Sequence, residues 1–266
     1  MRHLFLTGLV LAFIIWLLRR KVSMTAVMPI GAALLALLYL LPLAELGRAV
    51  WLGVASPKSL EMTATLALTM VMENQLRTSG MLKRMVTSLS QALPDRRMVM
   101  AALPAMIGML PSPGGAVFSA PMVAEAAEGV AAGPEQKALI NYWYRHIWEY
   151  VSPLYPGIIL AAGLTGLSTQ QLFLAHLPFA LTVVIAGAWF CFKDIERMPE
   201  QAAPPDGRWR PLGTFLLMSS PILISLSLVV AFKVSAVLAL SGGVLTLFVA
   251  LRSGPLQILK TLRESL

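Results

Sequence analysis

Cysteine, histidine and charged residues are all scarce in this chain of 266 residues. The one cysteine, Cys191, excludes an intramolecular disulfide, and three histidines far apart in sequence exclude a Cys/His zinc site. Charged residues make up 13% of the chain, against roughly 25% in an ordinary soluble domain. Apolar residues make up 57%, which is more than a soluble fold of this size can bury. The composition therefore excludes a soluble globular enzyme, a disordered chain and a coiled coil.

The sequence also excludes several function classes. Phosphate-binding loops, serine-hydrolase elbows, zinc-protease helices and calcium loops have no match in the sequence. The net charge of +8 comes from Lys and Arg residues scattered over many loops, so it predicts no nucleic-acid surface. We expect no enzyme activity, no resident metal and no cofactor.

Long uncharged runs predict an all-α membrane protein with about seven transmembrane helices and the lipid bilayer as a partner. The runs cover residues 4–18, 22–44, 60–76, 150–192, 211–232 and 234–251, and that of 60–76 contains an internal acid, Glu73. The 43 residues of 150–192 hold two spans divided at Gly166–Thr169. Arg19, Arg20 and Lys21 follow the first run directly. The positive-inside rule places them in the cytoplasm, with the N-terminus outside a bacterial inner membrane.

A further segment, residues 98–127, is uncharged as far as Ala124 and predicts a re-entrant hairpin. Its arms, Met98–Leu110 and Ala116–Ala127, have 13 and 12 residues, about 20 Å each, and cannot cross a hydrocarbon core of about 30 Å. With a hairpin, 17 of the 21 Lys and Arg residues lie in the cytoplasm; with one kinked span, only 9 do. The charge distribution favours the hairpin.

The first transporter-like unit, residues 1–192, is followed by a Pro-rich charged linker at 193–212 and by a partial second copy at 213–266. Lys21-Val22-Ser23 recurs as Lys233-Val234-Ser235, an offset of 212 residues, and Pro42-Leu43 recurs as Pro255-Leu256. Five crossings precede the linker, so the second copy enters the membrane inverted. Because the second copy is incomplete, we expect either a truncated product or a half-unit that pairs with another chain, including a second copy of itself.

The tip of the hairpin predicts a binding site for a small anionic solute. Glycines let a ligand approach backbone amides, and the second arm presents a helix N-terminus to an anion. The alternative is a simple break in a span. The tip candidates are Pro111, Ser112, Pro113, Gly114, Gly115 and Ser119.

The second candidate segment is a discontinuous helix over residues 137–168. A polar, aromatic stretch runs into a Pro-x-x-Pro-Gly break, which frees backbone carbonyls for a ligand or a cation. An interfacial aromatic belt is the alternative, and we favour it for Trp143 and Trp148. The binding candidates are Ser152, Pro153, Pro156 and Gly157; the coupling or gating candidates are Asn141, Arg145, His146 and Glu149, with Arg145 and Glu149 at pairing distance on a helix.

Glu73 and Asn74 end the third span. An acid there can carry a coupling proton. Arg77 follows Glu73 by four residues, which slightly favours an interfacial ion pair instead.

Two segments carry a resemblance to a known family: LPSPGGAVFSAPMV at residues 110–123 and NYWYRHIWEYVSPLYPGIILAAG at residues 141–163. They resemble an uncharacterised family of bacterial integral membrane proteins, a domain of unknown function grouped with the ion transporter superfamily. That group also holds gluconate permeases, dicarboxylate and citrate carriers, and Na⁺/H⁺ antiporters. The resemblance implies two inverted repeats, each with a hairpin and a broken helix.

Together these features predict an ion-coupled secondary transporter of a small organic anion, with Na⁺ or H⁺ as the coupling ion. A Na⁺/H⁺ antiporter that uses Glu73 or Glu149 is the first alternative. A membrane scaffold or assembly subunit without transport activity is the second.

Overall fold

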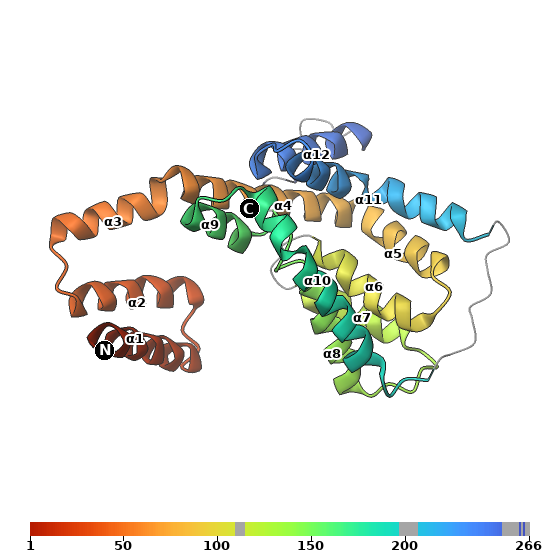
Figure 1. The fold of residues 1–266 in the computed structure, drawn as a ribbon, viewed down its shortest axis with the longest axis horizontal. Helices are drawn as coiled ribbons and strands as arrows, with labels where there is room; N and C mark the ends of the chain where they lie inside the picture. Colours follow the sequence, from red (N-terminus) through yellow and green to blue (C-terminus); the bar gives the residue numbers. More distant parts are fainter. Residues whose placement is uncertain (110–114, 197–206, 252–260, 262, 264–266) are drawn as a thin grey trace. The chain divides into compact units, whose positions relative to one another are not determined.

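The computed structural model describes residues 1–109, 115–196, 207–251, 261 and 263, and in these residues every regular element is an α-helix. The all-α prediction is therefore confirmed for the described residues. The helices are α1 (Arg2–Arg19), α2 (Met24–Leu38), α3 (Leu43–Ala55), α4 (Pro57–Thr78), α5 (Met81–Ala92), α6 (Arg96–Gly108), α7 (Gly115–Ala126), α8 (Pro134–Arg145), α9 (Pro156–Thr165), α10 (Thr169–Phe192), α11 (Trp209–Val230) and α12 (Ala236–Ala250) (Figure 1).

The chain divides into two compact units, Met1–Leu60 and Glu61–Leu266. In the first unit α1 and α2 pack as a helical hairpin. The second uncharged run, expected to be helical over residues 22–44, ends its helix at Leu38. Leu40 adopts a left-handed conformation (φ 51°) and the amide of Leu41 donates to the carbonyl of Ala36, a bond that closes a helix C-terminus. Pro42 then precedes α3, so the predicted span is shortened by a turn.

The joint between α1 and α2 has the same local geometry as the joint between α11 and α12. Lys21 and Lys233 both adopt the left-handed conformation, with φ of 62° and 57°. Ser23 and Ser235 follow as extended N-cap residues, and each opens a helix of 15 residues. At both places the repeated Lys-Val-Ser sequence thus lies where one helix ends and the next begins.

A glycine in each second helix fits closely against the first. A side chain on Gly31 would place its Cβ 2.8 Å from Cδ1 of Ile14, and one on Gly243 would collide with Oγ of Ser225. The two glycines are separated by the same 212 residues as the two lysines. Close helix contact at a small residue is typical of membrane helix pairs.

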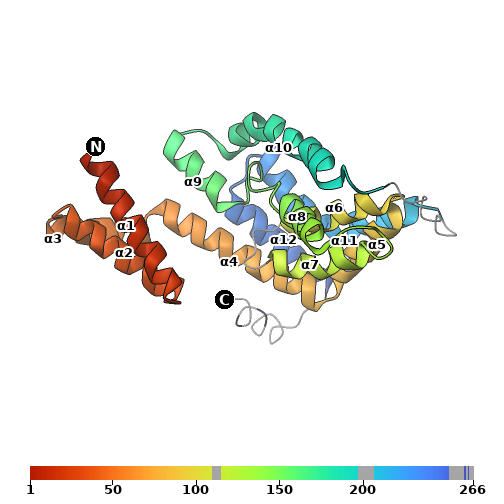
Figure 2. The same ribbon diagram turned by 90° about the horizontal axis from the view of Figure 1, so that it is seen from below.

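The second unit has two main apolar clusters. One joins α4, α5, α6, α11 and α12, with Met72, Met85, Leu103, Ile222 and Leu240 at its centre. The other joins α6, α7, α8 and α10. α6 packs against both α7 and α8, and these helices lie side by side in both views (Figures 1 and 2).

Two helices, α10 and α11, are long and apolar enough to cross a membrane. Four shorter apolar helices have 10 to 17 residues: His3–Arg19, Met24–Leu38, Pro156–Thr165 and Ala236–Ala250. Only 11% of the most apolar stretch of α10 is buried within the protein. An exposed apolar helix of this length is consistent with a membrane protein.

Candidate functional site

The two arms that the sequence predicts around residues 98–127 are separate helices, α6 and α7, packed against each other. Four of the tip candidates, Pro111, Ser112, Pro113 and Gly114, lie outside the described residues, and Gly115 is the first residue of α7. Ser119, the last tip candidate, is fully buried on α7.

Ser119 contacts a candidate from the second predicted segment. Its hydroxyl donates to Oδ1 of Asn141 at 2.5 Å, and Nδ2 of Asn141 donates to the carbonyl of Ala116 at 2.8 Å. Asn141 therefore binds both a side chain and a backbone carbonyl in the first turn of α7. Ser119 and Asn141, which are 22 positions apart in the sequence, are thus hydrogen-bonded to each other in the protein interior.

The helical path is interrupted between α8, which ends at Arg145, and α9, which begins at Pro156. Residues between them form turns, in which the amide of Ser152 donates to the carbonyl of Trp148 at 2.8 Å. Pro156 has no amide hydrogen to give and so occupies the first position of α9. The Ser152 side chain is buried, and its Oγ accepts from the amide of Leu154 at 3.4 Å.

Arg145 places its guanidinium in the interior next to this interruption. The residue is 4% exposed, and Nη1 donates to the hydroxyl of Tyr155 at 3.1 Å. That hydroxyl donates in turn to the carbonyl of Gly108, the last residue of α6, at 2.7 Å. A buried cation is costly unless hydrogen bonds hold it, and this chain of bonds ties it to both α6 and α9.

Gly108 and Tyr155 are site residues that the sequence argument missed. A side chain on Gly108 would collide with the backbone carbonyl of Arg145, so only glycine lets α6 approach the end of α8. Nearby, Nε1 of Trp148 donates to the carbonyl of Ala105 at 2.7 Å. The one available signal was an isolated glycine inside an apolar helix, a pattern that marks close packing.

His146 and Glu149 lie on a more exposed side of the same segment. Nδ1 of His146 is 2.6 Å from the carbonyl oxygen of Tyr142, so that nitrogen carries a proton, and Nε2 is 3.7 Å from Oε1 of Glu149. The Glu149 side chain is 46% exposed. The structure thus places His146 beside Glu149, whereas Arg145 reaches inward to Tyr155.

Trp143, assigned to an interfacial belt from sequence, has an interhelical contact. Its Nε1 donates to the carbonyl of Val183 on α10 at 2.9 Å. The bond is possible because Gly187, one turn along α10, leaves room for the indole ring. His176 of α10 also reaches the broken segment, where its Nδ1 is 2.8 Å from the carbonyl oxygen of Tyr150.

Glu73 and Asn74 lie on α4, in a different part of the second unit. Asn74 is buried, and its Oδ1 accepts from Nη2 of Arg77 at 3.3 Å. Glu73 and Arg77 both line a cavity of about 20 Å³ whose remaining described walls are apolar. The Arg77 guanidinium, expected to pair with Glu73, donates a hydrogen bond to Asn74.

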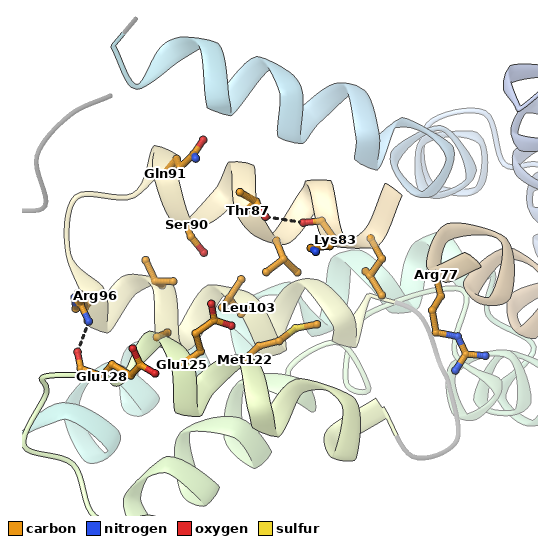
Figure 3. Close-up of a pocket in the computed structure, with 14 residues that line it drawn as sticks. Arg77, Lys83, Thr87, Ser90, Gln91, Arg96, Leu103, Met122, Glu125 and Glu128 are labelled. Carbon is orange, nitrogen blue, oxygen red and sulfur yellow. Dashed lines mark hydrogen bonds between the residues drawn. The ribbon is translucent and has the colours of Figure 1, made fainter. Parts of the chain in front are cut away.

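A larger pocket of about 610 Å³ lies between α5, α6 and α7 (Figure 3). Lys83, Thr87 and Ser90 line it from α5, opposite Met122 and Glu125 of α7. At one end Arg96 donates to the backbone carbonyl of Glu128, and at the other end lies Arg77. This pocket was not predicted, because its lining comes from amphipathic and apolar helices that converge only in three dimensions.

Among the described residues, no three His, Cys, Asp or Glu side chains come together in a way that could hold a metal ion. The polar groups of the site are one buried guanidinium, amide and hydroxyl side chains, and the backbone carbonyls of the turns between α8 and α9, several of which accept hydrogen bonds within those turns. Such a set suits a small anion near Arg145 and a cation near the carbonyls.

The chain belongs to the family described as "Protein of unknown function (DUF401)", which matches residues 4–265. No curated protein matches the chain.

Proposed function

We propose that this member of the DUF401 family is an ion-coupled secondary transporter for a small organic anion, embedded in a bacterial inner membrane. Support comes from the exposed apolar surface of α10 and from the matched α1–α2 and α11–α12 joints, which fit an internally repeated architecture. The likeness of residues 110–123 and 141–163 to the ion transporter superfamily points the same way.

The observation that carries the proposal is the buried guanidinium of Arg145 at an interrupted helix. Charged groups inside membrane helices are rare because they are expensive, and they mark substrate or ion pathways. Arg145 is held by Tyr155, which is itself bound to the end of α6. A carboxylate is the kind of anion that a guanidinium recognises.

Transport by the purified 266-residue chain in liposomes tests the proposal. Radiolabelled gluconate, succinate and citrate are offered under an imposed pH gradient or Na⁺ gradient. We expect gradient-dependent uptake of at least one of them, lost in Arg145→Gln and retained in Arg84→Gln, an exposed arginine on α5. Full uptake by Arg145→Gln, with equal protein per vesicle, would remove Arg145 from the pathway; no uptake of any solute would reject the transporter.

The proposed topology has seven crossings, a re-entrant α6–α7 hairpin and an external N-terminus. Single cysteines at Lys21, Arg96 and Arg208, introduced after Cys191→Ser, should react with an impermeant maleimide only from the cytoplasmic side. A cysteine at Lys58 should react only from outside. Reaction of the Arg208 position from outside would mean that α6 and α7 together make a crossing.

A Na⁺/H⁺ antiporter remains the second candidate, because Glu73 lines a cavity. Antiport needs a titratable carboxyl in the pathway and no organic anion. In the same vesicles it would appear as Na⁺-dependent alkalinisation of the lumen without uptake of any labelled solute.

A further inference from the structure

A row of polar residues runs along α4, the helix with the most buried polar side chains. Glu61, Thr65, Thr69, Glu73 and Arg77 follow one another at every fourth position, so neighbours in the row lie over each other on the helix surface. Thr65 and Thr69 are both 0% exposed. At about 1.5 Å per residue, Glu61 and Glu73 are roughly 18 Å apart along the helix.

The two threonines show how this row is kept inside an apolar bundle. The hydroxyl of Thr65 donates to the carbonyl of Glu61 and that of Thr69 donates to the carbonyl of Thr65, each at 2.7 Å. Each hydroxyl oxygen still has lone pairs that can accept a hydrogen bond. The row therefore places hydrogen-bonding oxygens between the two carboxyl groups.

Glu73 faces the small cavity at the other end of this row. Besides Glu73 and Arg77, the described walls of the cavity are Leu76 of α4, Leu82 and Met85 of α5, Met106 and Ile107 of α6, and Ile222 of α11. A cavity of about 20 Å³ has room for one water molecule when a polar group binds it. Apolar walls disfavour the charged carboxylate, and the neighbouring guanidinium favours it.

The cavity and the large pocket share two walls. Arg77 and Leu82 line both the cavity at Glu73 and the 610 Å³ pocket between α5, α6 and α7. The pocket contains further charged and hydroxyl groups, including Lys83, and is wide enough to hold water. Arg77 and Leu82 therefore border the pocket on one side and the cavity at Glu73 on the other.

We infer that Glu73 is a proton-binding site, loaded from the pocket between α5, α6 and α7 past Arg77 and Leu82. A proton passes from a hydronium ion in the pocket to the carboxylate, leaving water, and it later returns from the carboxylic acid to a water molecule, which becomes hydronium again. Arg77 is the charged group beside Glu73 among the described walls of the cavity, whose walls from α5, α6 and α11 are apolar. The pocket adds further charged groups to its lining: Lys83, Arg96, Glu125 and Glu128.

A proton fits this position better than Na⁺. Hard cations take several oxygen ligands, whereas the described walls of the cavity offer one carboxyl, one guanidinium and otherwise apolar side chains. The inference that Glu73 binds a proton does not depend on the transport proposal. Only a role of Glu73 in coupling rests on that proposal.

Infrared difference spectroscopy of the protein in lipid nanodiscs tests the site without any solute. A pH step should change the carbonyl stretch of a protonated carboxylic acid in the wild type. The band should be absent in Glu73→Gln, shifted but present in Glu73→Asp, and unchanged in Glu135→Gln, an exposed acid in the first turn of α8. A pH-dependent band that is identical in Glu73→Gln and the wild type, or no such band in the wild type, would overturn the inference.

Leu82→Ala tests access from the pocket while leaving Glu73 in place. Removing most of the Leu82 side chain should speed deuterium exchange of the same carboxyl band on transfer to heavy water. Unchanged exchange in Leu82→Ala, with a slower rate in a control that fills the cavity, Met85→Phe, would place the access route elsewhere and overturn the proposed loading path.

Vesicle transport separates the site from its coupling role. In Glu73→Gln, uptake driven by a pH gradient should be lost while solute exchange with no gradient continues, because exchange needs no net proton movement. If pH-driven uptake is intact in Glu73→Gln, the inference fails and the transporter stands. If the wild type transports nothing but shows the Glu73 band, the transporter fails and the proton site stands.

Discussion

The helices α4 and α10 have similar lengths, 22 and 24 residues, but distribute polarity in opposite directions. On α10 many of the large apolar side chains are exposed; Phe179 is 65% exposed and Trp189 is 71% exposed. On α4 the side chains of Thr65, Thr69, Asn74 and Gln75 are buried. In water this arrangement is unfavourable at both helices. It becomes favourable when hydrocarbon surrounds α10 and polar groups of α4 satisfy one another inside.

The contrast between α4 and α10 is tested most strongly by a charge on the exposed face of α10. Ile185 is 63% exposed near the middle of the helix. If that face contacts lipid, Ile185→Asp should reduce membrane integration by about 3 kcal/mol, the cost of an acid at the centre of a transmembrane helix. The fraction of chain that resists alkaline extraction from membranes measures it, with Ile185→Ala as the control. Integration equal to that of the control would place this face in water.

A second change tests the inner face of the same helix. Gly187 lies so close to Trp143 that a Cβ would collide with the indole ring. Gly187→Val should destabilise the protein by about 2 kcal/mol through overpacking and loss of the bond from Trp143 to Val183. Gly213→Val on α11, where nothing lies near the added group, is the matched control. Thermal unfolding in detergent micelles compares the two, and equal midpoints would contradict the packing of α8 on α10.

A third change concerns the polar interior of α4. Thr69→Val keeps the shape of the side chain and removes a hydroxyl that donates to its own helix. The expected loss is about 1 kcal/mol, the net worth of one ordinary hydrogen bond. Thr87→Val on α5, whose hydroxyl makes the same kind of bond at an exposed position, should cost less. A larger loss at Thr87, measured by thermal unfolding, would contradict the burial of the α4 row.

Local sequence signals located much of this fold. Gly166 and Ser168 mark the turn before α10: Gly166 is left-handed, and Ser168 and Gln171 form a reciprocal cap. The stretch around Pro153 and Pro156 likewise coincides with the interruption between α8 and α9. Proline and glycine act on the backbone within a few residues, so their effect can be predicted without knowledge of the rest of the chain.

The features that could not be predicted from the sequence depend on which helices pack against each other. Tyr155 and Gly108 are 47 residues apart, and their bond exists only because α6 packs against the end of α8. The pocket between α5, α6 and α7 is missing from the sequence argument for the same reason. The helix in the second uncharged run ends earlier than the run itself for a different reason. Leu40 takes a left-handed conformation that leucine rarely adopts, so no glycine in the sequence marks the end of α2.

The smallest expected effect is that of Leu181→Ala, and its comparison with Leu172→Ala tests which face of α10 is buried. Leu181 is 62% exposed, and Leu172 of the same helix is 6% exposed and packs with Tyr155 and Ile158. Leu172→Ala should cost at least about 2 kcal/mol, because it leaves a cavity in a packed cluster. Leu181→Ala should change stability by less than about 0.5 kcal/mol, as an exposed substitution that removes few contacts. Unfolding in lipid bicelles measures both variants under identical conditions. A loss at Leu181 equal to that at Leu172 would show that another protein surface, not lipid, covers the outer face of α10.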